Sequence, residues 1–200
     1  MLKVGITGGI GSGKSFICDI FERLGIPIFH ADIVSQQIVE KDPEVKTKII
    51  ELLGFEVYSD GHLNRNAVSE IVFGNKDLLQ KLNDIVHPAV FESFNSWAES
   101  QIKYPYILKE AAIIFESGAE KYLDFVITIS APEELRINRV TKRDQVDRRK
   151  VLDRVNNQWN DEQRMRKSDF VIANDEKTLL LPQIIETHNT LIEKSKKRIK

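Results

Sequence analysis

Short apolar runs recur along the chain and alternate with longer stretches in which apolar residues follow a helical period. The runs are rich in β-branched and aromatic residues and do not alternate strictly with polar ones, which is typical of strands buried on both faces of a parallel sheet. The pattern therefore predicts a doubly wound α/β fold with a parallel sheet of about five strands. The expected strands are Leu2–Thr7, 27–30, 106–114, Phe125–Ser130 and Phe170–Ala173.

Helices are expected between and after these strands, and several have recognisable ends. The first is followed by Gly25 and Pro27, residues that commonly terminate a helix. Proline is favoured at the first position of a helix, so two further helices are expected to begin at Pro88 and Pro132. The expected helices are 15–24, 87–100, 132–143 and 179–194.

Two helical stretches interrupt the alternation of strand and helix. The stretch of about 32–103 is too long for a simple crossover and is predicted to be an inserted helical subdomain. The stretch of about 144–167 is polar and rich in arginine, and is predicted to be a mobile helical lid. The core is then made of the remaining segments of a single domain, which are about 1–31, 104–143 and 168–200.

Composition limits the partners and the cellular compartment that the protein is expected to have. A net charge of −1 over 200 residues favours neither nucleic acid nor a membrane surface as a partner. The single cysteine, Cys18, excludes an intrachain disulfide and suits a reducing compartment. The N-terminus lacks the layout of a signal peptide, and no apolar run approaches the ~20 residues that span a bilayer. A cytoplasmic protein is expected, with a monomer as the default.

The clearest chemical signal is the stretch from Gly8 to Ser15, which matches the phosphate-loop pattern G-x-x-x-x-G-K-[ST] in full. Glycines let the backbone wrap round an anion, and the N–H groups and the following helix end bind phosphates. Lys14 adds a charge, and the Ser15 hydroxyl is suited to bind Mg²⁺. The expected nucleotide ligands here are Gly9, Gly11, Ser12, Gly13, Lys14, Ser15 and Phe16.

A glycine-rich turn that simply starts a helix is the alternative for this stretch. An expected strand precedes it and an expected helix follows it, which favours a nucleoside triphosphate site. The loop alone does not specify the reaction. A GTPase is disfavoured because the sequence contains no D-x-x-G switch motif.

Small P-loop kinases carry an acid after the second strand, an acceptor subdomain and an arginine-rich lid, and candidates for all three are present. Asp32 follows the second expected strand, where ligands gather in parallel sheets, although it could instead be only the N-cap of a helix over 33–40. Arg136, Arg139 and Arg143 are spaced to share one helix face. They could stabilise a transferring phosphoryl group or form an ordinary solvated surface.

An ordered set of motifs makes the chain similar to the dephospho-CoA kinase family over most of its length. The phosphate loop opens the set, and Asp60-Gly61 with Arg65 resembles the family's D-G-x-L-x-R motif. Further matches are His87-Pro88, Phe115-Glu116, Arg139 with Arg143-Asp144, Gln158, and the stretch 168–174 that ends in Asn174. The departures are His30 for an expected Asp, Gln36 for an expected Arg, and Ala112 for an expected Pro.

The resemblance implies a P-loop NTPase-type core that uses ATP and Mg²⁺ to phosphorylate the ribose 3′-hydroxyl of dephospho-CoA, the last step of coenzyme A biosynthesis. It implies catalytic roles for Asp32, Lys14 and Arg139, and nucleotide contacts from Arg143 and Asn174. It also implies contacts to the acceptor from Asp32, Arg65, His87 and Glu116. Because Gln36 departs from the pattern, a nucleoside monophosphate or sugar kinase stays open as an alternative, as does a regulatory ATPase.

Overall fold

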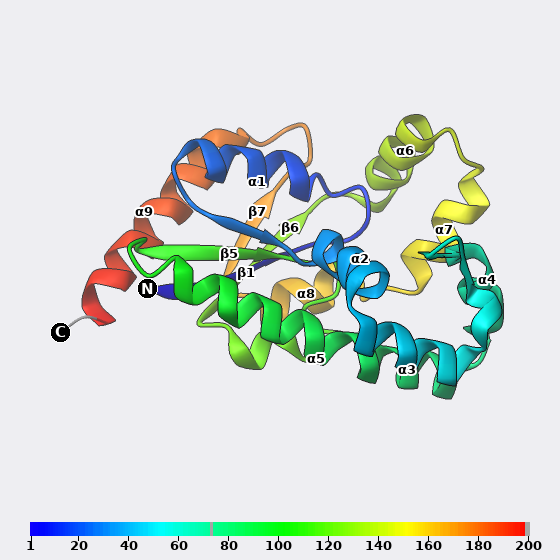
Figure 1. Ribbon diagram of the computed structural model, residues 1–200. Helices are drawn as coiled ribbons and strands as arrows, with labels where there is room; N and C mark the ends of the chain where they lie inside the picture. Colours follow the sequence, from blue (N-terminus) through cyan, green and yellow to red (C-terminus); the bar gives the residue numbers. More distant parts are fainter. Residues whose placement is uncertain (73, 199–200) are drawn as a thin grey trace. The chain divides into compact units, whose positions relative to one another are not determined.

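The computed structural model describes residues 1–72 and 74–198 (Figure 1). The chain divides into two compact units. The first combines Met1–Phe29 with Ser100–Lys200, and the second is His30–Glu99.

A five-stranded parallel sheet forms the centre of the first unit. Its strands are β1 (Leu2–Thr7), β2 (Ile28–His30), β5 (Tyr106–Glu110), β6 (Phe125–Ser130) and β7 (Phe170–Ala173). They lie in the order β2-β5-β1-β6-β7, so that β1 is central. The expected strand 106–114 is shorter than predicted, because its backbone leaves the sheet after the Ala111 N–H bonds Ile6 O and then forms a turn.

The two faces of β1 are covered differently. Val4 and Ile6 are fully buried in a core cluster that includes Ile17 and Phe21 of one helix and Ile184 of another. Gly5 faces the opposite way, where an added Cβ would lie within 2.7 Å of Ile114 and Leu123. The central strand is therefore enclosed on both faces, as its continuous apolar sequence predicts.

The helices of the first unit pack on both faces of this sheet. In Figure 1, α1 and α9 lie on one face, and α8 lies on the other, against β6. The bounds of these elements are α1 Lys14–Arg23, η2 Ala119–Tyr122, α6 Glu133–Asp144, α7 Arg148–Asn156, α8 Asp161–Lys167 and α9 Leu180–Arg198.

The arginine-rich stretch 144–167 is packed more extensively than its polar sequence suggests. It forms α7 and α8, and Val151 of α7 is buried in a cluster with Ile137 and Val140 of α6. Arg164 of α8 is fully buried. Residue type alone predicts that an arginine is exposed. Its burial requires specific partners that offset the desolvation of its charge.

The second unit is mostly helical, with one short antiparallel hairpin and a core that includes Val45, Ile49 and Val57. Its elements are α2 Ala31–Lys41, α3 Pro43–Leu53, η1 Phe55–Val57, β3 Tyr58–Ser59, β4 His62–Leu63, α4 Arg65–Val72 and α5 Lys76–Ser100, the last residue of which belongs to the first unit.

One prediction about helix starts in this unit is wrong, and one alternative that the sequence left open is removed. The helix expected to begin at Pro88 begins at Lys76, with Pro88 inside it. Asn75 starts it by accepting the Leu78 N–H, and a buried stripe that includes Val86 and Val90 carries it past the proline. The N-cap of α2 is His30, so Asp32 lies in the first turn and is not a cap.

Candidate active site

The phosphate-loop sequence forms a tight turn between the end of β1 and the start of α1. Gly11 and Gly13 have φ angles of +79° and +90°, which favour glycine. A Cβ on Gly11 would lie 2.4 Å from Arg136 O, and one on Gly13 would lie 2.3 Å from Asn174 Nδ2. Both conformation and space therefore require glycine at these two positions.

The first turn of α1 provides the charge of an anion site. Lys14 and Ser15 begin this helix, and no acidic residue lies in its first turn. The helix dipole and the unpaired N–H groups make this end favourable for phosphate. The Lys14 Nζ donates to Gly8 O at 3.0 Å, which places the ammonium group at the start of the loop. The arrangement can bind the phosphates of a nucleotide.

Asn174 bonds this loop and Arg139 bonds Asn174, while their expected roles toward a ligand stay predictions. The Asn174 side chain donates to Ser12 O at 2.8 Å. The Arg139 Nη2 donates to Asn174 O at 3.2 Å and to Glu176 Oε1 at 3.0 Å. The Arg139 Nη1 is buried and has no hydrogen-bond partner within residues 1–72 and 74–198.

Arg143 and Phe16 are more open. The Arg143 guanidinium donates to Asp144 at 2.6 Å and has a side-chain exposure of 67%. The hydrogen bond from Arg143 lowers the pKa of the Asp144 carboxyl. Phe16, in the first turn of α1, is 59% exposed and is available for a ligand.

Glu110 is a candidate that sequence reasoning missed. It is the last residue of β5, it is buried, and it lies in register with Ile6 of β1 just before the phosphate loop. The pKa of the Cys18 thiol is raised chiefly by burial, and Glu110 raises it further while Lys14 lowers it. Glu110 and Lys14 therefore both lie close to Cys18, at the same end of the sheet. The sequence offered no clear signal, because Glu110 is internal to the expected strand 106–114 and the pairing of β5 with β1 was not known.

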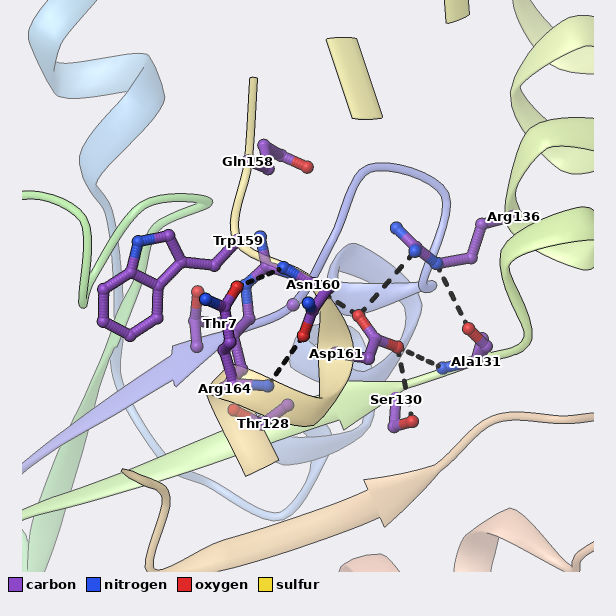
Figure 2. A network of polar contacts seen from close by, with 12 residues as sticks. Thr7, Thr128, Ser130, Ala131, Arg136, Gln158, Trp159, Asn160, Asp161 and Arg164 are labelled. Atoms are coloured by element: carbon purple, nitrogen blue, oxygen red, sulfur yellow. Dashed lines mark hydrogen bonds and ion pairs between the residues drawn. The ribbon is translucent and has the colours of Figure 1, made fainter. Parts of the chain in front are cut away.

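A polar network around the buried Arg164 of α8 lies beside the loop (Figure 2). The Glu116 Oε1 accepts from the Trp159 N–H at 3.0 Å and from the Arg164 Nη2 at 3.1 Å. The Arg164 Nη1 also donates to Asp161 Oδ1 at 3.3 Å. On the other side of Asp161, the Arg136 Nη2 lies 3.9 Å from Oδ1.

The remaining predicted residues belong to the second unit. Asp32 is exposed in the first turn of α2, two residues after the end of β2. Arg65 is exposed at the start of α4, and His87 is half-buried within α5. In the described part of the chain, no helix is long and apolar enough to cross a membrane.

A parallel sheet with β1 at its centre and a glycine-rich phosphate loop leading into α1 defines a P-loop NTPase fold. The family model for dephospho-CoA kinase matches residues 2–179, and this chain belongs to the dephospho-CoA kinase family. The family's reaction is the ATP-dependent phosphorylation of dephospho-CoA in coenzyme A biosynthesis, and the chain is accordingly a transferase. The predicted family and fold are confirmed, and another kinase specificity is not favoured.

Individual relatives agree with this assignment. A dephospho-CoA kinase from Bacteroides fragilis is 36% identical over 193 residues, which cover 96% of this chain and 94% of the relative. Among solved structures, a dephospho-CoA kinase from Campylobacter jejuni is 26% identical, with a TM-score of 0.67 and 98% of each chain covered. A protein from Thermus thermophilus is 27% identical, with a TM-score of 0.82 and coverage of 96% of this chain and 97% of its own.

Proposed function

We propose that this chain transfers the terminal phosphoryl group of Mg²⁺–ATP to the ribose 3′-hydroxyl of dephospho-CoA. The observation that carries the proposal is the complete phosphate loop between β1 and α1, in a chain that the dephospho-CoA kinase model matches over residues 2–179.

The phosphate loop is proposed to hold the triphosphate through its backbone N–H groups other than those of Ile10 and Ser12, which donate to Gln158 Oε1 and Gly9 O. Lys14 neutralises charge at the transferred group. Mg²⁺, when bound with ATP, neutralises further charge, and its protein partners are proposed to be the Ser15 hydroxyl and the Glu110 carboxylate. Oxygen ligands of this kind are the ones that Mg²⁺ prefers.

The nucleoside part of ATP is proposed to lie beside Asn174 and Arg139. Support comes from the hydrogen bonds that tie Asn174 to Ser12 O and Arg139 to Asn174 O. The buried Arg139 Nη1, which lacks a partner among the described residues, is a donor suited to a phosphate or ring nitrogen. The open side chains of Phe16 and Arg143 are proposed as outer contacts.

On the acceptor side, we propose that Asp32 accepts a hydrogen bond from the ribose hydroxyl and takes its proton late in the transfer. Arg65 and His87 are proposed to bind the acceptor. The stretch 144–167 is proposed to act as a lid that excludes water, which favours transfer over hydrolysis. We expect a cytoplasmic monomer.

The test is a panel of acceptors containing dephospho-CoA, AMP, pantothenate and gluconate, with ADP release as the readout. We expect a large increase over background only with dephospho-CoA, and a product whose new phosphate mass spectrometry assigns to the ribose 3′ position. Robust transfer to a different acceptor, with no phosphate gained by dephospho-CoA, would contradict the proposal.

Lys14→Ala tests the role of the loop. The variant should lose nearly all turnover while keeping the wild-type circular dichroism spectrum, because Lys14 contributes charge and little packing. Lys3→Ala is a matched control near the start of β1, at the opposite end of that strand from the loop. A folded Lys14→Ala protein with wild-type phosphoryl transfer would reject the assignment of the loop.

A further inference from the structure

Arg164 is the largest fully buried side chain among the described residues. Burying a guanidinium is costly, and only close partners offset the loss of hydration. Its partners are Glu116 Oε1 at 3.1 Å and Asp161 Oδ1 at 3.3 Å. A buried ion pair is weak evidence for stability, because apolar residues of similar volume often serve as well. The role of this pair is therefore sought in the local geometry that it fixes.

The pair fixes the turn between α7 and α8. Glu116 holds the turn from one side, because its Oε1 also accepts the Trp159 N–H at 3.0 Å. Asp161 holds it from the other side, since its Oδ2 accepts the Ala131 N–H at 3.1 Å. The Asn160 side chain caps α8 within a capping box. Glu116, from the turn segment that follows β5, and Ala131, directly after β6, thus clamp this turn in place.

The clamped turn reaches the phosphate loop at Ile10. The Gln158 Oε1 accepts the Ile10 N–H at 2.9 Å. The Ile10 side chain packs against the buried cluster that contains Val140 of α6 and Val151 of α7. Backbone and side chain of Ile10 are therefore both held by residues outside the loop.

The same network touches the loop at Gly9. A Cβ on Gly9 would lie 2.0 Å from Arg136 Nη1 and 3.4 Å from Arg164 Nη1, so two guanidinium groups lie against this backbone. Arg136 is oriented by its hydrogen bond to Ala131 O at 3.1 Å and by Asp161, whose Oδ1 is 3.9 Å away. Figure 2 shows Asp161 between the two arginines.

We infer that Glu116 and Arg164 are positioning residues for the phosphate loop, which they act on through the turn Gln158–Asp161 and through Arg136. Glu116 is thereby assigned to nucleotide binding and not to the acceptor, contrary to what its motif implied. The inference rests on the proposed function only in that the loop binds the nucleotide. It requires that loss of the charge pair weakens nucleotide binding while binding of the acceptor is retained.

Glu116→Gln tests the pair most directly. The amide oxygen can still accept the Trp159 N–H, but the charge that faces Arg164 is lost. We expect the Kd for ADP, measured by calorimetry, and the KM for ATP to rise about tenfold. The KM for dephospho-CoA should stay within about twofold of wild type. Glu162→Gln is the matched control, because Glu162 pairs with Arg166 on the exposed face of the same helix; it should change none of these constants.

Two results with Glu116→Gln would overturn the inference. A lower melting temperature with an unchanged Kd for ADP would make the pair merely structural. A rise confined to the KM for dephospho-CoA would make Glu116 an acceptor ligand. Because ADP binding requires no transfer, the calorimetry remains decisive even if the acceptor is a different molecule.

Gln158→Ala keeps the inference testable if Glu116→Gln does not fold. It removes the hydrogen bond to the Ile10 N–H and leaves the buried charges in place. We expect the same selective rise in the Kd for ADP, of about three- to tenfold. An unchanged Kd for ADP in this variant would contradict the coupling between the turn and the loop.

Discussion

At the scale of single residues, the structure decides between two interpretations of Asp32. The sequence allowed Asp32 to be only a helix cap. The structure removes that alternative, because His30 is the N-cap of α2 and Asp32 lies within its first turn. An exposed carboxylate two residues beyond the end of β2 is better explained by a role toward a ligand.

Asp32→Asn should therefore lower kcat by about 10²- to 10⁴-fold, the usual contribution of a general base. The KM for ATP should stay nearly unchanged, because the lost interaction is made mainly in the transition state. Measuring kcat across a Mg²⁺ titration separates the base from a metal-linked role, since recovery at high Mg²⁺ would point to the metal.

Asp42→Asn is the matched control for this substitution. Asp42 is a true N-cap in the same unit, where its Oδ1 accepts the N–H groups of Glu44 and Val45. Asparagine caps about as well as aspartate, so activity and stability should hardly change. Wild-type kcat in the Asp32→Asn variant would refute the proposed catalytic role.

At the scale of elements, the helix α5 shows where local signals fail. Proline is normally excluded from a helix interior, because it lacks an N–H and its ring crowds the preceding turn. Here a stripe of buried residues, which includes Val86, Val90 and Phe94, continues on both sides of Pro88 and keeps one helix from Lys76 to Ser100. Packing of that stripe outweighs the cost of the proline to the helix. A local sequence pattern cannot compare these two free energies, because the packing depends on the tertiary structure.

Pro88→Ala should therefore stabilise the protein by about 1–3 kcal/mol, because it restores an N–H donor and removes the crowding. Urea unfolding followed by circular dichroism gives the change in free energy of unfolding. Pro43→Ala is the control, because Pro43 lies at the start of α3, where proline is favoured. A destabilised Pro88→Ala protein would mean that packing of the proline ring outweighs its cost to the helix.

At the scale of the whole molecule, one buried contact links α9 to the sheet and makes stability depend on pH. The Tyr106 hydroxyl lies 2.7 Å from His188 Nδ1, and Tyr106 is fully buried. Burial raises the pKa of Tyr106, so its hydroxyl stays protonated and shares a hydrogen bond with the imidazole, whose tautomer decides which group donates. Burial also lowers the pKa of His188 from its ordinary value of 6.5.

It follows that stability should fall as the pH drops below about 6.5, since the unfolded chain then binds a proton at His188 that the folded chain does not. Above that pH the imidazole is neutral in both states and its contribution is constant. His188→Gln should reduce the fall in the free energy of unfolding below about pH 6.5. Urea unfolding between about pH 7.5 and about pH 5.5 measures this change.

His62→Gln is the control for the pH profile, because His62 is an exposed histidine of the second unit. The slope for His188→Gln is compared with that of this variant, because each loses one imidazole. An identical slope in the His188→Gln variant would instead assign the pH dependence to other groups.

The sequence by itself determined the core strands, the phosphate loop and the family. Each of these depends on local pattern or on residue types at fixed spacing, as in the stretch from Gly8 to Ser15. Only the tertiary structure revealed the buried pair of Glu116 and Arg164, and the place of Glu110 beside the loop. These residues are distant in sequence, and a charged side chain can be buried only beside particular partners. Which partners those are follows from the order of strands in the sheet, and residue type does not encode that order.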